Sequence, residues 1–295
     1  MQKILANRVA NNRGILYFAV TMSVFICSLN SGSNGNCYYV GNQHEAILVD
    51  AGLSCRETEK RMLRAGLSMG KVKAIFVSHE HSDHIRGIPV IAKKYDLPVY
   101  ITPGTLSNSS WLQVELDRHH VYLLRAFTEI SIGDLTITAF PKIHDAMDPH
   151  SFIVCCGDIK IGVFTDLGRP CDQLIAHFKQ CHAAFLEANY DEQMLDSGRY
   201  PWHLKNRIRG GRGHLSNREA LQLFLDHRPQ HLSHLLLAHL SQDNNNPQLV
   251  QQLFDQHANG VHVTVASRHV ESAVYCIENG MSTVVNKAEQ LAISF

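Results

Sequence analysis

The chain contains 295 residues, carries a formal net charge of zero and is 45% hydrophobic and 18% charged. A chain of this length forms one large domain or two small ones and can bury a sizeable core. The neutral charge argues against bulk attraction to nucleic acid or anionic membranes, although it allows a local basic patch. The eight cysteines form no CxxC pair, so we expect buried thiols in a reducing cytoplasm.

The N-terminal region has two interpretations. Residues 15–29 form an apolar stretch that follows two arginines, as in a signal peptide. No clean cleavage site follows, and the stretch is short for a bilayer span. We therefore assign residues 23–29 to a first core strand and treat residues 1–21 as an extension outside the core, with Met22 as an alternative start.

Short β-rich runs dominate the first part of the chain. Glycine and asparagine clusters such as SGSNGN separate these runs as turns. Apolar residues at helical spacing indicate amphipathic helices between the later runs. In chain order, the pattern predicts strands at 23–29, 36–41, 46–52, 72–78 and 97–102, and helices at 56–67 and 85–96.

The second part follows a polar stretch, 104–125, for which no element is predicted. The pattern predicts strands at 130–141, 151–157, 160–166, 183–190, 234–241 and 261–267, and helices at 171–180, 217–228 and 247–258. The strands come first in hairpin order and later alternate with helices. This order favours two sheets with helices outside over one doubly wound sheet. We place the domain at 22–270 and a tail of undefined structure at 271–295.

A cluster of metal-ligand side chains follows the strand expected at 72–78. The stretch FVSHEHSDHIRGI contains His79, His81, Asp83 and His84. In an extended chain His79 and His81 lie on the same side and can face one ion, while Asp83 and His84 can face a second. Imidazole suits zinc, iron and manganese, and a carboxylate favours a hydrolytic site. The alternative is a solvated histidine-rich loop, which the spacing disfavours.

This H-x-H-x-D-H motif, with an upstream strand that ends in VDAG, resembles the metallo-β-lactamase fold superfamily over roughly residues 22–270. The resemblance implies an α/β fold, a four-layer αββα sandwich of two mixed sheets with helices outside. It also implies a binuclear metal site at one edge between the sheets. His144, Asp166 and His239 stand where the remaining ligands of the family lie, on loops at strand ends.

Each of these three residues has a competing interpretation. His150 is the local competitor of His144, which we prefer because it directly follows the alternating strand pattern. Asp166 could be an ordinary turn residue. His239 could be a buried core histidine, like its neighbours at 231 and 234.

The resemblance implies a ligand set for two divalent ions: zinc or manganese, with iron also accepted. One ion would be held by His79, His81 and His144 and the other by Asp83, His84 and His239, with Asp166 and a water or hydroxide bridging them. Asp50 matches a position that supports the histidine loop by hydrogen bonding. Such a metal pair suits hydrolysis of phosphodiesters, lactones, thioesters or lactams equally well.

Two further motifs, LEANYD and GRGHLSN, reduce the range of possible substrates. Glu187 ends a predicted strand and His214 precedes a predicted helix. The two residues resemble the Glu and His of the transfer-RNA 3′-processing branch of the fold. The resemblance implies that they deliver a proton to the leaving oxygen, alongside the catalytic carboxylates Asp83 and Asp166. Alternatively, His214 merely precedes the N-cap Ser216 and Glu187 is a surface acid.

A basic stretch, 197–218, surrounds this histidine and contains no Asp or Glu. Arginine forks bind phosphate oxygens bidentately, and aromatic residues in the stretch can stack on bases. The alternative is a solvated loop. The candidate phosphate contacts are Arg199, Lys205, Arg207, Arg209 and Arg212.

Several segments in the same order resemble the YycJ (WalJ) branch of the superfamily: SLNSGSNGNCYY, FVSHEHSDHIRGI, FTDLG, LEANYDE, YPWHLKNRI, GHLSN and AHLSQDNNNP. The resemblance implies a bacterial cytosolic nuclease with 5′-to-3′ exonuclease action on double-stranded DNA and no membrane partner. A hydrolase of a small cyclic phosphodiester, lactone or thioester is the alternative. A non-catalytic scaffold or sensor is a third interpretation, which the complete ligand set disfavours.

Overall fold

The computed structural model describes residues 8–9, 17–18, 22–278 and 281–285. The extension expected at 1–21 lies largely outside the described residues. Within it, β1 (Arg8–Val9) pairs antiparallel with β2 (Tyr17–Phe18).

Eight strands form the first sheet, in the order β17-β16-β3-β4-β5-β6-β7-β8. They are β3 (Val24–Asn30), β4 (Cys37–Gly41), β5 (Ala46–Val49), β6 (Val72–Phe76), β7 (Val99–Ile101), β8 (Val121–Leu123), β16 (Tyr275–Glu278) and β17 (Met281–Val284). Hairpins join β3, β4 and β5, and β5 to β8 run parallel. The sheet is therefore mixed, with its parallel part leading into the histidine motif.

Seven strands form the second sheet, in the order β15-β14-β13-β12-β11-β10-β9. They are β9 (Glu129–Ile132), β10 (Leu135–Pro141), β11 (His150–Cys156), β12 (Ile159–Phe164), β13 (Ala183–Glu187), β14 (His234–Ala238) and β15 (His262–Val265). The first four strands are antiparallel and β12 to β15 are parallel. Helices connect the parallel strands, as a crossover between parallel neighbours requires.

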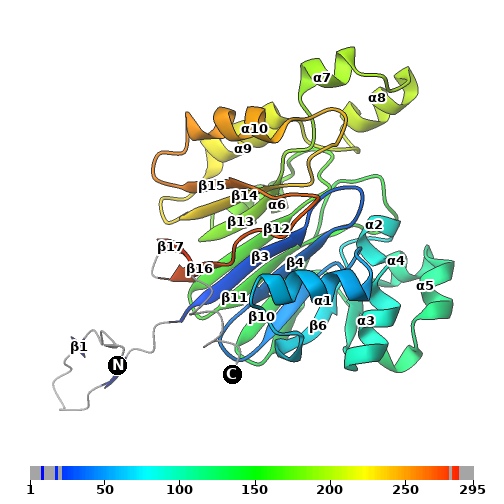
Figure 1. Cartoon of the computed structure of the whole chain (residues 1–295), viewed down its shortest axis with the longest axis vertical. Helices are drawn as coiled ribbons and strands as arrows, with labels where there is room; N and C mark the ends of the chain where they lie inside the picture. Colours follow the sequence, from blue (N-terminus) through cyan, green and yellow to red (C-terminus); the bar gives the residue numbers. More distant parts are fainter. Residues whose placement is uncertain (1–7, 10–16, 19–21, 279–280, 286–295) are drawn as a thin grey trace.

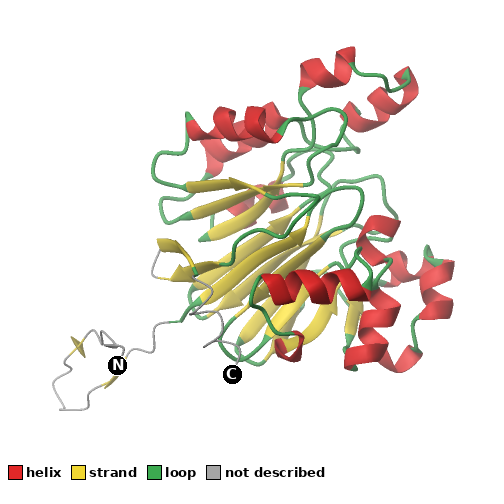
Figure 2. Ribbon diagram, viewed as in Figure 1, coloured by secondary structure: helices red, strands yellow, loops and turns green. Residues whose placement is uncertain are grey.

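Helices cover the outer faces of both sheets, and a core of apolar side chains fills the space between them (Figure 1). Helices α1 (Cys55–Arg64) and α3 (Ile88–Tyr95) pack on the first sheet. Helices α6 (Asp172–Phe178), α9 (Asn217–His227) and α10 (Pro247–Asp255) pack on the second. Figure 2 shows the resulting layers of helix, sheet, sheet and helix. The expected αββα sandwich is confirmed.

Local sequence signals account for the ends of several helices. Helix α9 begins after Ser216, whose hydroxyl accepts a hydrogen bond from the backbone of Glu219 in a capping box. Helix α10 begins after Asn246, which caps its first turn, with Pro247 at a position where a missing N–H costs nothing.

Within the described part of the chain, no helix is long and apolar enough to cross a bilayer.

The helix predicted at 85–96 is confirmed as α3, but it begins three residues later than expected. A short helix, α2 (Ser82–Ile85), precedes α3 and is separated from it at Gly87. The backbone N–H of Gly87 donates to the carbonyl of Ala51. A Cβ at this glycine would lie 1.8 Å from the carbonyl oxygen of Leu53. Close approach of two backbone segments, which helical periodicity does not report, ends the first helix.

Short elements also occupy segments for which the sequence predicted none. The polar stretch 104–125 contains most of α4 (Pro103–Ser107), then α5 (Ser110–Glu115), a 3₁₀ turn at Arg118–His120 and β8. A 3₁₀ turn at Met69–Lys71 precedes β6. Helices α7 (Glu192–Ser197) and α8 (Trp202–Arg209) precede and overlap the basic stretch, and β16 adds to the edge of the first sheet after residue 270.

Gly87 provides a test of this close approach. We expect Gly87→Ala to lower the free energy of unfolding by about 1–3 kcal/mol, the usual cost of forcing atoms into filled space. Gly70→Ala is the matched control, because its added Cβ would meet only the Ser68 hydroxyl at 3.4 Å. Urea unfolding followed by circular dichroism measures both, and equal stabilities of the two variants would contradict the prediction.

Candidate active site

Strand register brings the candidate residues to one edge of the sandwich. In the first sheet, Asp50 and His79 follow the adjacent ends of the parallel strands β5 and β6. In the second sheet, Asp166 and His239 follow the ends of β12 and β14, and Glu187 ends the strand between them. Residues far apart in the sequence therefore converge because neighbouring parallel strands end together.

The first group of donors contains three histidines. Nε2 of His79 lies 3.0 Å from Nδ1 of His81, and Nε2 of His144 lies 3.4 Å from the same nitrogen. His79 and His144 are buried. The ligand atoms of the three lie within 4.8 Å of one another, a spacing that can hold a metal ion.

The second group contains Asp83, His84 and His239. Oδ2 of Asp83 lies 3.5 Å from Nε2 of His84 and 3.7 Å from Nε2 of His239. Asp166 lies between the groups, with Oδ2 at 3.3 Å from His84 and Oδ1 at 3.9 Å from His144. One carboxylate thus reaches donors of both groups.

Hydrogen bonds fix which ring nitrogen each histidine presents. Nδ1 of His84 donates to Oδ2 of Asp50 at 2.7 Å, which leaves Nε2 for the donor group. The Ser78 hydroxyl donates to the same carboxylate and contacts Nδ1 of His79 at 2.8 Å. Nδ1 of His144 donates to the carbonyl of Gly213. Such partners orient metal-binding imidazoles.

Three site residues have left-handed backbone conformations: Asp50, Asp166 and His239, with φ of 60°, 55° and 57°. Asp50 and His239 directly follow strands and Asp166 lies two residues after one, so each left-handed turn redirects the chain as it leaves a sheet. This conformation costs a non-glycine residue free energy and persists only where the surroundings enforce it, commonly at functional sites.

The donor set fits divalent metal ions. Oδ2 of Asp166 and Nε2 of His239 are buried and make no hydrogen bond within the described residues. Buried polar atoms without partners are costly, and both point to a ligand that completes them. Mixed imidazole and carboxylate donors suit zinc, manganese or iron.

Electrostatics also favours a cation at this edge. Burial opposes a charge on His239, but the Asp166 carboxylate and contacts that include Glu187 raise its pKa to about 10. The pKa of His84 is likewise held well above its usual value, against the effect of burial, by Asp166 and Asp50. In the metal-free protein both nitrogens of these imidazoles are protonated. Their positive charges partly offset the negative charges of the carboxylates.

Glu187 and His214 form a hydrogen-bonded pair beside these groups. Oε1 of Glu187 lies 2.7 Å from Nδ1 of His214 and 3.0 Å from Nδ1 of His239. Its Oε2 accepts from the backbone of Leu167. Burial raises the pKa of the Glu187 carboxyl, but its contacts with the two histidines lower it by more. The resulting pKa is about 2. Glu187 is therefore a buried carboxylate and not a surface acid.

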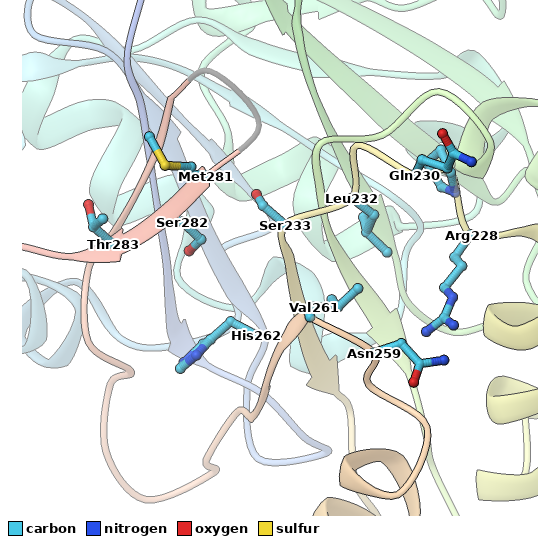
Figure 3. Close-up of a pocket in the computed structure, with 12 residues that line it drawn as sticks. Arg228, Gln230, Leu232, Ser233, Asn259, Val261, His262, Met281, Ser282 and Thr283 are labelled. Carbon is cyan, nitrogen blue, oxygen red and sulfur yellow. The ribbon is translucent and has the colours of Figure 1, made fainter.

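The side chains of the competing histidines make other contacts. His150 begins β11 and contacts the backbone carbonyl of Asp148. His234 begins β14, at the opposite end from His239, and contacts Ser282 and Thr264. A cavity of about 610 Å³ also lies at that opposite end (Figure 3). Its lining contains no carboxylate and none of the donors described above.

Several basic residues of 197–218 contact acidic residues that lie outside that stretch. Arg207 pairs with Asp145, which follows the donor His144. Arg209 pairs with Asp196, and Lys205 donates to the backbone carbonyl of the same residue. Arg199 precedes α8, and the backbone of Arg212 packs against Gly168 after the Asp166 turn. The local positive excess is smaller than the sequence suggested.

Sequence similarity agrees with this geometry. A family model described as a beta-lactamase superfamily domain matches residues 45–239. An exodeoxyribonuclease YycJ from Bacillus anthracis is 37% identical over 235 residues, 80% of this chain and 89% of that protein. The chain belongs to the beta-lactamase superfamily. An exodeoxyribonuclease WalJ from Streptococcus pneumoniae is 32% identical over 225 residues, 75% of this chain and 83% of that protein.

Solved structures share the fold. The metallo-beta-lactamase fold protein YhfI from Bacillus subtilis has a TM-score of 0.64 at 16% identity, over 85% of this chain and 99% of that one. Zn²⁺-bound PqqB from Methylobacterium extorquens has a TM-score of 0.66 at 15% identity, over 84% of this chain and 99% of that one. The resemblance to the superfamily and to its YycJ (WalJ) branch is confirmed.

Sequence patterns missed a polar network behind the donors. Asn36, in the SGSNGN turn, donates to Oδ2 of Asp83 at 3.1 Å and lies 3.0 Å from Nε2 of His84. The hydroxyl of Tyr38 donates to the side-chain oxygen of Asn36, and the hydroxyl of Ser31 accepts from the backbone of His239. A glycine-rich turn is a weak signal by itself, and only the register of β3 and β4 reveals its role.

Lys142 is a second residue that sequence reasoning missed. It is 6% exposed, and its ammonium donates to the carbonyl of Thr165 at 2.7 Å. It therefore joins the loop that carries His144 to the turn that carries Asp166. Burial lowers the pKa of this ammonium, and nearby carboxylates, Asp166 above all, act against that effect.

The raised pKa values make metal binding depend on pH. Because the pKa of His239 is about 10 and that of His84 is also raised, both are protonated at pH 7 without metal, and an incoming ion must displace protons. We expect manganese or zinc binding to release at least one proton per chain at pH 7, and affinity to fall about tenfold per pH unit for each proton released as pH decreases.

Calorimetric titration of the metal-free protein in two buffers with different ionisation enthalpies measures this release. His239→Ala should reduce the number of protons released, whereas His231→Ala, at an exposed position of the opposite end, should not. A binding enthalpy that is independent of the buffer would contradict the prediction.

Proposed function

We propose that the chain is a metal-dependent phosphodiesterase acting on nucleic acid, as a 5′-to-3′ exonuclease on double-stranded DNA. The observation that carries this proposal is the buried Glu187–His214 pair in contact with the donor groups. Metal sites of this kind hydrolyse many substrates, but a positioned proton donor is needed most when the leaving group is an alkoxide. The exodeoxyribonucleases similar to this chain support the choice of DNA.

The proposed cofactor is a pair of divalent ions, zinc or manganese, with iron also accepted. Bound ions would supply an activated water and offset charge on the phosphate oxygens. The residues proposed to hold them are His79, His81 and His144 for one ion, Asp83, His84 and His239 for the other, and Asp166 for both. Asp50 would keep His84 oriented through its hydrogen bond.

His214 is the proposed general acid. Its Nδ1 contacts Glu187, so Nε2 is the nitrogen left to face a substrate. The side chain of His214 is 20% exposed, whereas that of Glu187 is fully buried. The carboxylate therefore orients the imidazole, and the imidazole gives its proton to the departing oxygen.

The basic residues at 199–212 are the proposed phosphate contacts. Arg207 and Arg209 lie on α8, and their ion pairs are exposed, where such pairs contribute little and can exchange for phosphate. Lys205 is on the same helix, and Arg199 and Arg212 flank it. The free cysteines support a reducing compartment, for which we propose the cytoplasm.

Cleavage of end-labelled duplex DNA, beside matched single-stranded DNA and RNA, tests the proposal. With manganese or zinc, we expect stepwise shortening from the 5′ end of the duplex and steep inhibition by salt, because several phosphates are bound at once. His79→Ala in parallel exposes contaminating nucleases. Turnover of small diesters or lactones without cleavage of any polymer would favour a small-molecule hydrolase instead.

His214 should matter most for a poor leaving group. We expect His214→Ala to lower kcat on duplex DNA by about 10²–10⁴-fold, the range for general acid catalysis. Hydrolysis of bis(p-nitrophenyl) phosphate should fall far less, because nitrophenolate departs without a proton. His262→Ala, at an exposed histidine beside the distant cavity, is the control. An equal loss on both substrates would show that His214 has a structural role only.

A further inference from the structure

A cavity of about 210 Å³ opens beside the proposed acid. His214 and His239 form part of its lining. One wall comes from Tyr200, Leu204 and Ile208, which belong to or precede α8. Helices α7 and α8, here called the α7–α8 lobe (residues 192–209), lie together at the edge of the molecule (Figure 1). The cavity therefore joins the lobe to the acid side of the candidate site.

The position of the proposed acid His214 indicates that the cavity lies on the leaving-group side of the scissile phosphate. Nδ1 of His214 is engaged by Glu187, so its proton is delivered from Nε2. The His214 ring lines the cavity, and whatever is bonded to the departing oxygen must lie next to that ring. The three-histidine donor group contributes none of its members to the cavity lining.

The charges of the lining favour an uncharged occupant. Arg207 and Asp145 form an ion pair with each other, and His239 contacts Asp83, Asp166 and Glu187. The positive groups of the lining therefore already have acidic partners, and a phosphate reaches Arg207 only where it replaces Asp145. The remaining lining combines apolar side chains such as Leu204 and Leu240 with polar Ser33, Ser241 and Asn189. A flat ring with polar edges suits such a surface.

Size limits the occupant to one such unit. The cavity is smaller than the roughly 300–1,000 Å³ of pockets that hold drug-sized ligands. One nucleoside is of the right order, and a base pair is too large. Tyr200 lines the cavity, and its hydroxyl donates to Asp243 at 2.8 Å, so this aromatic side chain is held in place where a base can stack.

We propose that this cavity binds the terminal nucleoside of the strand being degraded, on the leaving-oxygen side of the scissile phosphate. This inference rests on the proposed function. A water oxygen forms the new bond to phosphorus, the P–O3′ bond breaks, and O3′ takes a proton from Nε2 of His214. The attacking water releases one proton to the solvent, and His214 takes up one proton from the solvent after the product leaves. The remaining strand keeps the phosphate at its new 5′ end.

Two consequences follow from a cavity of this size. The enzyme removes one nucleotide at a time from a 5′ end, because only the terminal residue has its leaving oxygen attached to a single nucleoside. The terminal base must also leave its pair before cleavage, which costs free energy and is easiest at a mismatched end.

The test compares ends that differ only in the terminal base. Duplexes with a normal, a mismatched or an abasic 5′-terminal nucleotide are digested by the metal-loaded full chain. We expect the mismatched end to react several-fold faster than a G·C end. We expect the abasic end to show about a tenfold lower kcat/KM than the mismatched end, because both are unpaired and only the abasic end lacks the stacked base. Equal kcat/KM for mismatched and abasic ends would overturn the inference and leave the proposed function standing.

A variant that fills the cavity provides the second arm. Leu204→Trp should lower kcat/KM at mismatched ends and bring the ratio of mismatched to abasic ends toward one. Leu225→Trp adds the same bulk at a 39% exposed leucine of α9 and should leave the ratio unchanged. An unchanged ratio in Leu204→Trp overturns the inference. Absence of any nucleic-acid cleavage by the wild type would instead overturn the proposed function and the inference with it.

Discussion

Convergence of carboxylates at one edge of the sandwich is the constraint on which the candidate site depends. Asp50, Asp166 and Glu187 are buried there, and Asp83 is partly exposed beside them. Like charges repel strongly where water is excluded. Protonated imidazoles and the ammonium of Lys142 offset part of this charge, and divalent cations can offset the rest. The carboxylates that orient the histidines therefore also create the need for metal.

The backbone holds this arrangement against its own preferences. Asp50, Asp166 and His239 adopt left-handed conformations that cost an L-residue roughly 1–2 kcal/mol each. They persist because each follows a strand whose neighbours are packed in the core between the sheets. A rigid pair of sheets thus places strained turns side by side, and the turns aim their side chains at a common point.

Most of the strands and the αββα class could be predicted from the sequence, because alternation and apolar runs are local properties. Four of the candidate donors could be named because H-x-H-x-D-H places them within six residues, whereas the other three were named through the family resemblance. The break at Gly87 could not, because it arises from a contact with Ala51 across the fold. Asn36 and Lys142 were missed for the same reason: a single polar residue has no pattern until register and loop packing place it beside its partners.

Chemistry and selection are carried by different parts of the molecule. The donors stand on strand ends supported by both sheets, whereas the wall of the leaving-group cavity belongs to the α7–α8 lobe. That lobe has its own small apolar cluster around Leu195 and Ile208, and an exposed ion pair joins Arg207 to the loop of His144. The backbone N–H of His214 donates to the carbonyl of Ile208, and the hydroxyl of Ser216 donates to Glu192, so the lobe is tied to the acid side of the candidate site. Substrate choice in this chain is best sought in the lobe, because its side chains line the cavity beside that acid.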